Sequence, residues 1–96
     1  MTLHELQTTK REQILYYADR SGARNVRIFG SVARGDNDAR SDIDFLVDLE
    51  PGRSLLHLIR LRRTLEALLD TTVDVVSSRG LRERMRQKVM AEAVPL

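Results

Sequence analysis

Apolar and polar residues alternate in three short segments of the chain, and such alternation is typical of half-buried β-strands. The three segments are residues 25–29, 41–49 and 72–77. In the second segment Ile43, Phe45 and Val47 fall on one face of the strand, because strand side chains alternate with period two. The other face carries Asp42, Asp44, Leu46 and Asp48.

Apolar residues recur at helical spacing in three further segments, residues 2–20, 54–69 and 81–93. Strands one and two are joined by too short a link for a crossover, so we expect them to be antiparallel. The second and third strands flank a helix, which predicts a parallel pair with a right-handed crossover. The sequence therefore predicts an α/β (α+β) fold, with a small mixed β-sheet of three to four strands flanked by helices.

The length of 96 residues predicts one domain that spans residues 1–96. The chain has no cysteine, which excludes disulfides and thiolate metal sites. Its two histidines, His4 and His57, match no zinc-ligand spacing. No apolar run is long enough to span a membrane, and the polar N-terminal segment lacks a signal-peptide core. These features predict a cytoplasmic protein.

Charge is spread unevenly along the chain, although the net charge is only +2. Residues 36–50 contain six acids and one base, and residues 79–88 contain five bases and one acid. The acidic segment indicates a site for a cation, and the basic segment indicates a surface for an anionic partner or a solvated helix face. The basic segment has no interleaved aromatic residues, which argues against direct nucleic-acid binding.

The acidic segment contains a D-x-D motif, Asp42 and Asp44, inside the second predicted strand. Their Cα atoms should lie about 6.5–7 Å apart on one face, where two carboxylates repel each other unless a cation lies between them. Mg²⁺ binds such carboxylates together with substrate phosphates. Asp74, the one acid in the third strand, is the candidate third ligand of a two-metal site and a group that helps to deprotonate an attacking hydroxyl.

A glycine–serine turn, Gly30-Ser31, precedes the D-x-D motif by ten residues. Glycine permits close approach of a ligand to the backbone, and Ser31 offers a hydroxyl, so this turn is a candidate cradle for nucleotide phosphates. Arg34 lies one helical turn further on and could pair with a phosphate oxygen or with a nearby acid.

The combination of GS, a ten-residue spacer, D-x-D and a further acid in the next strand resembles the nucleotidyltransferase superfamily that includes DNA polymerase beta. Within it the chain resembles the minimal nucleotidyltransferases (MNT), from Val26 to the closing AEAVPL. The resemblance implies a nucleotidyltransferase fold. It also implies that Asp42, Asp44 and Asp74 are catalytic residues that bind Mg²⁺, expected as two ions, and that Gly30 and Ser31 hold the phosphates of ATP.

The resemblance also implies a partner and a reaction. Short MNT proteins of this kind are commonly antitoxins of HEPN-domain toxins, and the active ones transfer AMP from ATP to a tyrosine of the toxin. We therefore expect a magnesium-dependent protein adenylyltransferase whose partners are ATP and a HEPN ribonuclease. Two alternatives stay open: an antitoxin that neutralises its toxin by binding alone, and a nucleotidyltransferase that acts on a small-molecule hydroxyl. For the first, a possible contact stripe consists of Leu81, Met85, Val89 and Met90, with Tyr16 and Tyr17 as further candidates.

Overall fold

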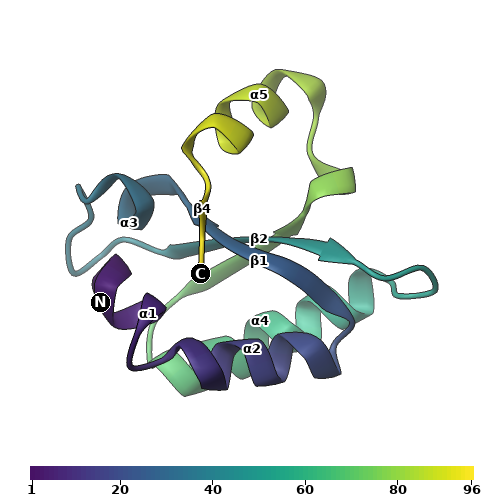
Figure 1. The fold of residues 1–96 in the computed structure, drawn as a ribbon, viewed down its shortest axis with the longest axis horizontal. Helices are drawn as coiled ribbons and strands as arrows, with labels where there is room; N and C mark the ends of the chain where they lie inside the picture. The colour runs from purple at the N-terminus through teal and green to yellow at the C-terminus, as the bar shows by residue number, and fades with distance from the viewer.

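The computed structural model describes all 96 residues and contains one four-stranded sheet (Figure 1). The strands follow the order β3-β2-β1-β4 across the sheet. Their bounds are Ala23–Phe29 (β1), Ile43–Leu49 (β2), Val73–Ser77 (β3) and Val94–Pro95 (β4). The helices are Leu3–Gln7 (α1), Arg11–Arg20 (α2), Gly30–Arg34 (α3), Leu55–Leu69 (α4) and Glu83–Glu92 (α5), with a 3-10 turn at Ser78–Gly80 (η1).

The pairing of the three predicted strands is confirmed. β1 runs antiparallel to β2, and β2 runs parallel to β3. α4 forms the crossover between the two parallel strands. The fourth strand, β4, was not predicted, because it is only two residues long and contains Pro95. It pairs antiparallel with β1 at Ile28 and Val94, so the C-terminus lies at one edge of the sheet.

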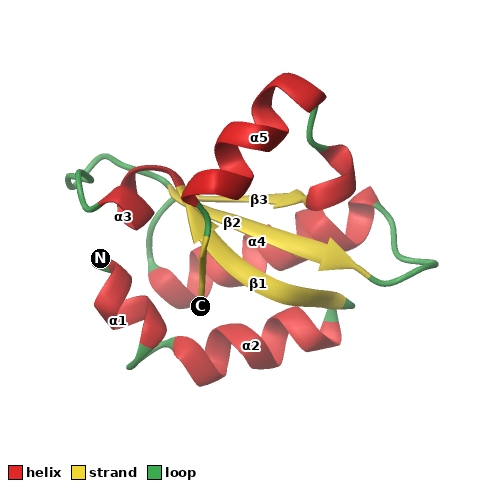
Figure 2. Cartoon of the chain, turned by 45° about the horizontal axis from the view of Figure 1, so that its top comes forward, coloured by secondary structure: helices red, strands yellow, loops and turns green.

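The main core lies between the sheet and the pair of helices α2 and α4, which cover the same face of the sheet (Figure 2). As the alternation predicted, Ile43, Phe45 and Val47 of β2 point into this core and are at most 2% exposed. Burial of a side chain of this size contributes about 1.5–3 kcal/mol to folding. β2 is therefore the central, most deeply buried strand.

α5 lies on the opposite side of the sheet from α2 and α4 (Figure 1). By strand alternation, Asp44 and Asp48 of β2 face this side, since Ile43, Phe45 and Val47 face the core. Leu46 lies on this face between Asp44 and Asp48, yet it is fully buried. Val89 of α5 is also buried, and both residues lie outside the main core cluster. The apolar burial of the protein thus extends beyond the main core to β2 and α5 on this side.

Two helix predictions need correction. Residues 2–20 form two helices, because the chain turns at Thr8, whose Oγ1 donates a hydrogen bond to the carbonyl of His4 (2.7 Å). Such a hydroxyl contact competes with continued helix. The last helix begins at Glu83, since the η1 turn precedes it, and Leu81 therefore lies outside the helix. None of the helices combines the length and the apolar character that crossing a membrane requires.

Candidate functional site

The parallel pairing of β2 with β3 brings two of the three predicted aspartates together. Asp44 is the direct partner of Asp74 across the two strands. Asp42 lies just before β2 and is exposed, as is Asp74, whereas Asp44 is half-buried. The sequence predicted Asp42 inside the strand and on the same face as Asp44, but β2 begins only at Ile43, so strand alternation does not extend to Asp42. The charges of Asp42 and Asp74 both act on the Asp44 carboxyl, so the three acids lie near one another at one end of the sheet.

Asp44 has a strongly perturbed carboxyl group. The pKa of Asp44 is raised to about 6, chiefly by burial and then by the negative charges of Asp74 and Asp42. Arg34 opposes this shift, and Glu92 adds to it. Near neutral pH the carboxylate is therefore held at a free-energy cost that a bound cation would remove.

Gly30 forms the turn between β1 and the short helix α3 and lies against Asp44. Its φ is +75°, in the left-handed region that favours glycine. A Cβ at this position would collide with Oδ2 of Asp44. Phe29, the preceding residue, pairs with Asp44 across β1 and β2. The predicted phosphate cradle and the D-x-D motif are thus in direct contact, and only glycine fits between them.

Arg34 lies at the end of α3 and has two carboxylate partners. Its Nε is 3.1 Å from Oδ2 of Asp36, and its Nη1 is 3.0 Å from Oε1 of Glu92. The same Glu92 oxygen accepts a hydrogen bond from the backbone N–H of Gly30 at 2.7 Å. These carboxylate contacts raise the pKa of Arg34, that with Asp36 most, so the guanidinium is always charged. Sequence reasoning missed Glu92, because no spacing connects it to the motif and only the path of α5 brings it here.

The donor atoms at this site suit a hard cation, although they do not form a complete cage. No group of three or more His, Cys, Asp or Glu side chains is placed to hold a metal ion by itself. Mg²⁺ is usually bound by one or two carboxylates, with substrate phosphates and water as its remaining ligands. The paired Asp44 and Asp74 with the nearby Asp42 fit that mode of binding, and the raised pKa of Asp44 indicates that its negative charge lacks a counter-ion.

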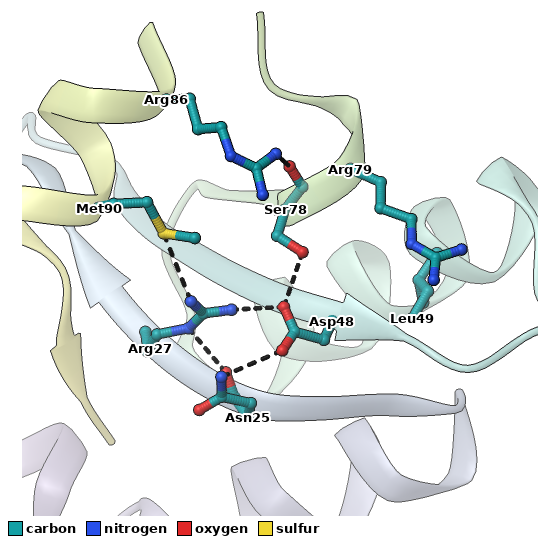
Figure 3. A pocket seen from close by; sticks show the side chains of 8 residues that line it. All are labelled: Asn25, Arg27, Asp48, Leu49, Ser78, Arg79, Arg86 and Met90. Atoms are coloured by element: carbon teal, nitrogen blue, oxygen red, sulfur yellow. Dashed lines mark hydrogen bonds and ion pairs between the residues drawn. The ribbon is translucent and has the colours of Figure 1, made fainter. Parts of the chain in front are cut away.

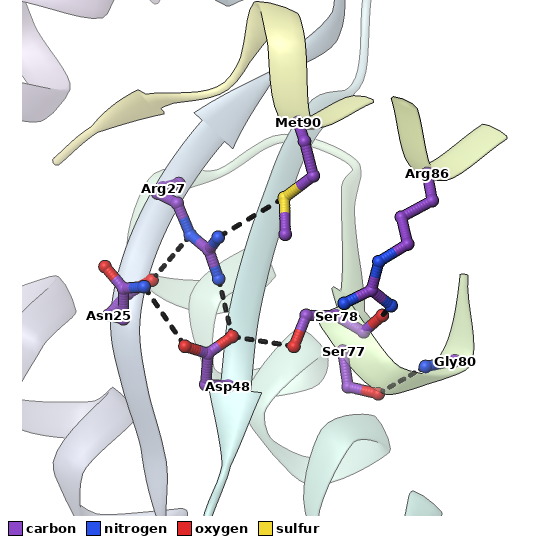
Figure 4. A network of polar contacts seen from close by, with 8 residues as sticks. All are labelled: Asn25, Arg27, Asp48, Ser77, Ser78, Gly80, Arg86 and Met90. Carbon is purple, nitrogen blue, oxygen red and sulfur yellow. Dashed lines mark hydrogen bonds and ion pairs between the residues drawn. The ribbon is translucent and has the colours of Figure 1, made fainter. Parts of the chain in front are cut away.

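A polar pocket of about 430 Å³ lies further along the same face, under η1 and α5 (Figure 3). Asp48 is at its centre and accepts hydrogen bonds from Arg27 (2.6 Å), Ser78 (2.7 Å) and Asn25 (3.0 Å). Arg86 of α5 donates to the carbonyl of Ser78 at 2.8 Å. The network links β1, β2, η1 and α5 (Figure 4), which gives it a structural role in holding α5 over the sheet.

The two strand aspartates that point to this face have opposite electrostatics. Burial alone would raise the pKa of Asp48, but hydrogen bonds from Ser78 and Asn25 and the charge of Arg27 outweigh it and lower the pKa below its ordinary value. Asp48 is thus neutralised by the protein itself, whereas Asp44 is not. Asp48 is therefore a structural acid, whereas Asp44, four residues earlier on the same strand, is a candidate metal ligand.

The possible contact stripe on the last helix is only partly accessible. Val89 is 5% exposed and therefore buried, whereas Met85 (55%) and Met90 (39%) are exposed. Of the two tyrosines, Tyr16 is 55% exposed, and it stacks edge-on against Tyr17. Two further exposed apolar residues, Leu55 and Leu56, lie in the first turn of α4.

Sequence and structure comparisons agree on the family. Residues 11–95 match the nucleotidyltransferase domain. The chain is 37% identical to the protein adenylyltransferase MntA of Thermococcus cleftensis, over 98% of this chain and 95% of that protein. A solved protein assigned as a minimal nucleotidyltransferase superposes with a TM-score of 0.87 at 50% identity, over 100% of this chain and 97% of the other.

A more distant solved structure shares the fold. It is a complex of a tri-AMPylated Shewanella oneidensis HEPN toxin with its MNT antitoxin, matched with a TM-score of 0.72 at 21% identity over 93% of this chain and 70% of that one. The resemblance that the motifs indicated is therefore confirmed over nearly the whole chain. This protein belongs to the nucleotidyltransferase domain family and has the fold of its minimal members.

Proposed function

We propose that the protein is a magnesium-dependent adenylyltransferase antitoxin, which transfers AMP from ATP to a tyrosine of a cognate HEPN ribonuclease toxin and thereby neutralises it. The observation that carries this proposal is the contact of Gly30 with Asp44, which in turn faces Asp74. A backbone that admits phosphate groups and a carboxylate without a counter-ion thus meet at one point. The 37% identity to a protein adenylyltransferase supports the transfer of AMP to a protein acceptor.

The reaction would be an in-line displacement at the α-phosphate of ATP. The tyrosine oxygen forms a bond to the phosphorus, the bond to the bridging oxygen breaks, and pyrophosphate leaves. Mg²⁺, when bound by Asp42, Asp44 and Asp74, would neutralise charge on the phosphate oxygens. Asp74 is exposed at the edge strand and is the group that we expect to accept the hydroxyl proton. Gly30, Ser31 and Arg34 would hold the triphosphate.

The surroundings of Asp74 favour a protein side chain as the acceptor. The hollow next to it has a volume of about 170 Å³, below the roughly 300–1,000 Å³ that small-molecule pockets usually have. Its lining is mostly apolar, with Leu55, Leu58, Ile59 and Val75 beside Asp74 and Arg62. An aromatic side chain presented by a partner would find apolar contacts there. We therefore place a small-molecule acceptor second, and with ATP as donor we propose a cytoplasmic location.

The experiment is a transfer assay with the HEPN protein encoded beside this chain. The two proteins are incubated with ATP and Mg²⁺, and the mass of the HEPN protein is measured. We expect a gain of one or more AMP units with the native chain and none with the D42N/D44N variant. Asp70→Asn is the matched control, because Asp70 is not among the proposed site residues and caps α4 in a left-handed conformation that asparagine also tolerates. No gain with the native chain would overturn the proposal.

The exposed apolar residues favour one second candidate, an antitoxin that acts by binding alone. Leu55 is 70% and Leu56 is 51% exposed, and such residues beside a partner-facing hollow could bury a contact surface. The two functions differ in how toxin activity responds to the D42N/D44N variant. Full neutralisation by that variant would support binding alone, and loss of neutralisation with retained complex formation would support transfer.

A further inference from the structure

Glu92 holds two of the donors that the proposed function assigns to the phosphates of ATP. Its Oε1 lies 2.7 Å from the backbone nitrogen of Gly30 and 3.0 Å from Nη1 of Arg34. The Glu92 side chain is 18% exposed, so this carboxylate is mostly withdrawn from water. The end of α5 that carries it meets the start of α3 at one end of the sheet (Figure 2).

We propose that Glu92 is part of the nucleotide site as an internal anion, which occupies the phosphate position in the free protein and is displaced when the triphosphate binds. The inference rests on the proposed function, since it takes the triphosphate to be the ligand of Gly30 and Arg34. One N–H group cannot donate a full hydrogen bond to two anions at once. A phosphate oxygen at Gly30 must therefore replace the Glu92 carboxylate.

The backbone around Glu92 makes this exchange local. Ala93 follows it and donates to the carbonyl of Val89 (2.9 Å), which closes the last turn of α5. Beyond that, β4 pairs with β1, and the N–H of Leu96 donates to the carbonyl of Val26 (3.1 Å). The backbone that follows Glu92 is thus held in place. Displacement of the Glu92 side chain from Gly30 would therefore loosen only the last turn of α5, while β4 stays paired with β1.

The exchange has a cost that appears in nucleotide affinity. Suppose that the Glu92 contact is formed in about nine of ten molecules of the free protein, so that only about one in ten can bind the triphosphate. The apparent Kd is then about tenfold higher than the intrinsic Kd. Removing the contact would then tighten triphosphate binding about tenfold. A residue that merely positioned Arg34 would have the opposite effect, because its loss would leave the guanidinium free to move and would weaken binding.

Three variants separate these outcomes. Glu92→Gln removes the charge, and Glu92→Asp keeps the charge but shortens the side chain so that it no longer reaches Gly30. Asp36→Asn is the control, since Asp36 pairs with Arg34 at 3.1 Å and does not contact Gly30. An internal anion predicts tighter binding for both Glu92 variants. A general effect of negative charge predicts tighter binding for E92Q and D36N but not for E92D.

The measurement is calorimetric titration of the purified chain with Mg·ATP, and with magnesium tripolyphosphate as a probe that lacks the base. We expect a Kd about tenfold lower for E92Q and E92D with both probes, and a change below about threefold for D36N. Unchanged or weaker binding by the Glu92 variants would overturn the inference, and so would a lack of binding in every form. Failure of AMP transfer with tighter binding retained would overturn the proposed function alone.

Hydrogen exchange gives a second readout that needs no variant. Binding of Mg·ATP to the native chain should speed exchange of the Ala93 amide at the end of α5. The Leu96 amide, held by Val26 in the β4–β1 region, should keep its rate. Slower exchange at Ala93 on nucleotide binding would contradict displacement of Glu92.

Discussion

Asp44 on β2 stands directly opposite Asp74 on β3, in a parallel pair that α4 connects. Two acids at partnered positions repel each other, and the half-buried Asp44 is affected most, because burial already disfavours its charged form. A folded protein that keeps such a pair gains nothing from it for stability. The pair therefore marks the place where we expect function to oppose stability.

Asp44→Asn should stabilise the metal-free protein at neutral pH. The pKa of Asp44 is raised to about 6 from the ordinary 3.8, so the folded state holds a proton that the unfolded chain has lost between these values. The stabilising contribution is fully present below pH 4 and is lost as the pH rises through 6. After allowance for solvent screening, we expect a gain for the variant of about 1 kcal/mol at pH 7. Urea unfolding at pH 4 and pH 7 measures this, and a less stable variant at pH 7 would contradict it.

Asp48→Asn should have the opposite effect on stability and destabilise the protein at neutral pH. The lowered pKa of Asp48 means that its contribution is present above the unfolded pKa and is lost as the pH falls through the folded value. The substitution leaves Arg27, whose side chain is 13% exposed, without a counter-charge. We expect a loss of about 1 kcal/mol at pH 7 in urea unfolding, after allowance for the partial exposure of Asp48. The loss should shrink toward pH 3, and Asp70→Asn should leave stability within about 0.5 kcal/mol.

Gly30→Ala should destabilise the protein and displace Asp44. The new Cβ would collide with Oδ2 of Asp44, and the left-handed backbone adds strain of about 1–2 kcal/mol for a residue with a Cβ. Gly35→Ala is the matched control, because Gly35 also has a positive φ (+80°) but its Cβ would meet no atom within 4 Å. Thermal unfolding should show a larger loss for G30A, and equal losses would mean that the collision is relieved at no cost.

Nucleotide binding should stabilise the protein only with a divalent cation. At a free ATP concentration of about 100 times the Kd, linkage predicts a gain of about 2.7 kcal/mol. EDTA should remove most of this gain, because the carboxylates of Asp44 and Asp74 repel the triphosphate without a cation between them. The D44N/D74N variant should lose the magnesium-dependent part of the gain. A shift in Tm that survives EDTA in the native chain would contradict a metal-bridged triphosphate.

Much of the fold followed from local pattern. Period-two alternation predicted β2 and its buried face of Ile43, Phe45 and Val47, and the short link after Gly30 predicted the antiparallel pairing. The break of the first helix at Thr8 was not predicted, because the helical spacing of apolar residues continues past it and the hydrogen bond from the Thr8 hydroxyl to the His4 carbonyl is visible only in the structure. β4 was missed because two residues that include a proline carry no strand pattern, and their pairing depends on the position of the β1 edge.

The candidate site divides in the same way. Strand alternation determined by itself that Asp44 lies on the face opposite Ile43, Phe45 and Val47, and chain order that Gly30-Ser31 precedes the D-x-D motif by a short segment, because these relations lie within short stretches of backbone. Only the tertiary structure decided that Leu46 is buried on that acidic face and that Glu92 reaches Gly30 from 62 residues away. Both depend on how segments far apart in the chain pack together, and the position of Glu92 depends on the path of α5, which the network around Asp48 helps to set and which no local pattern in the sequence encodes.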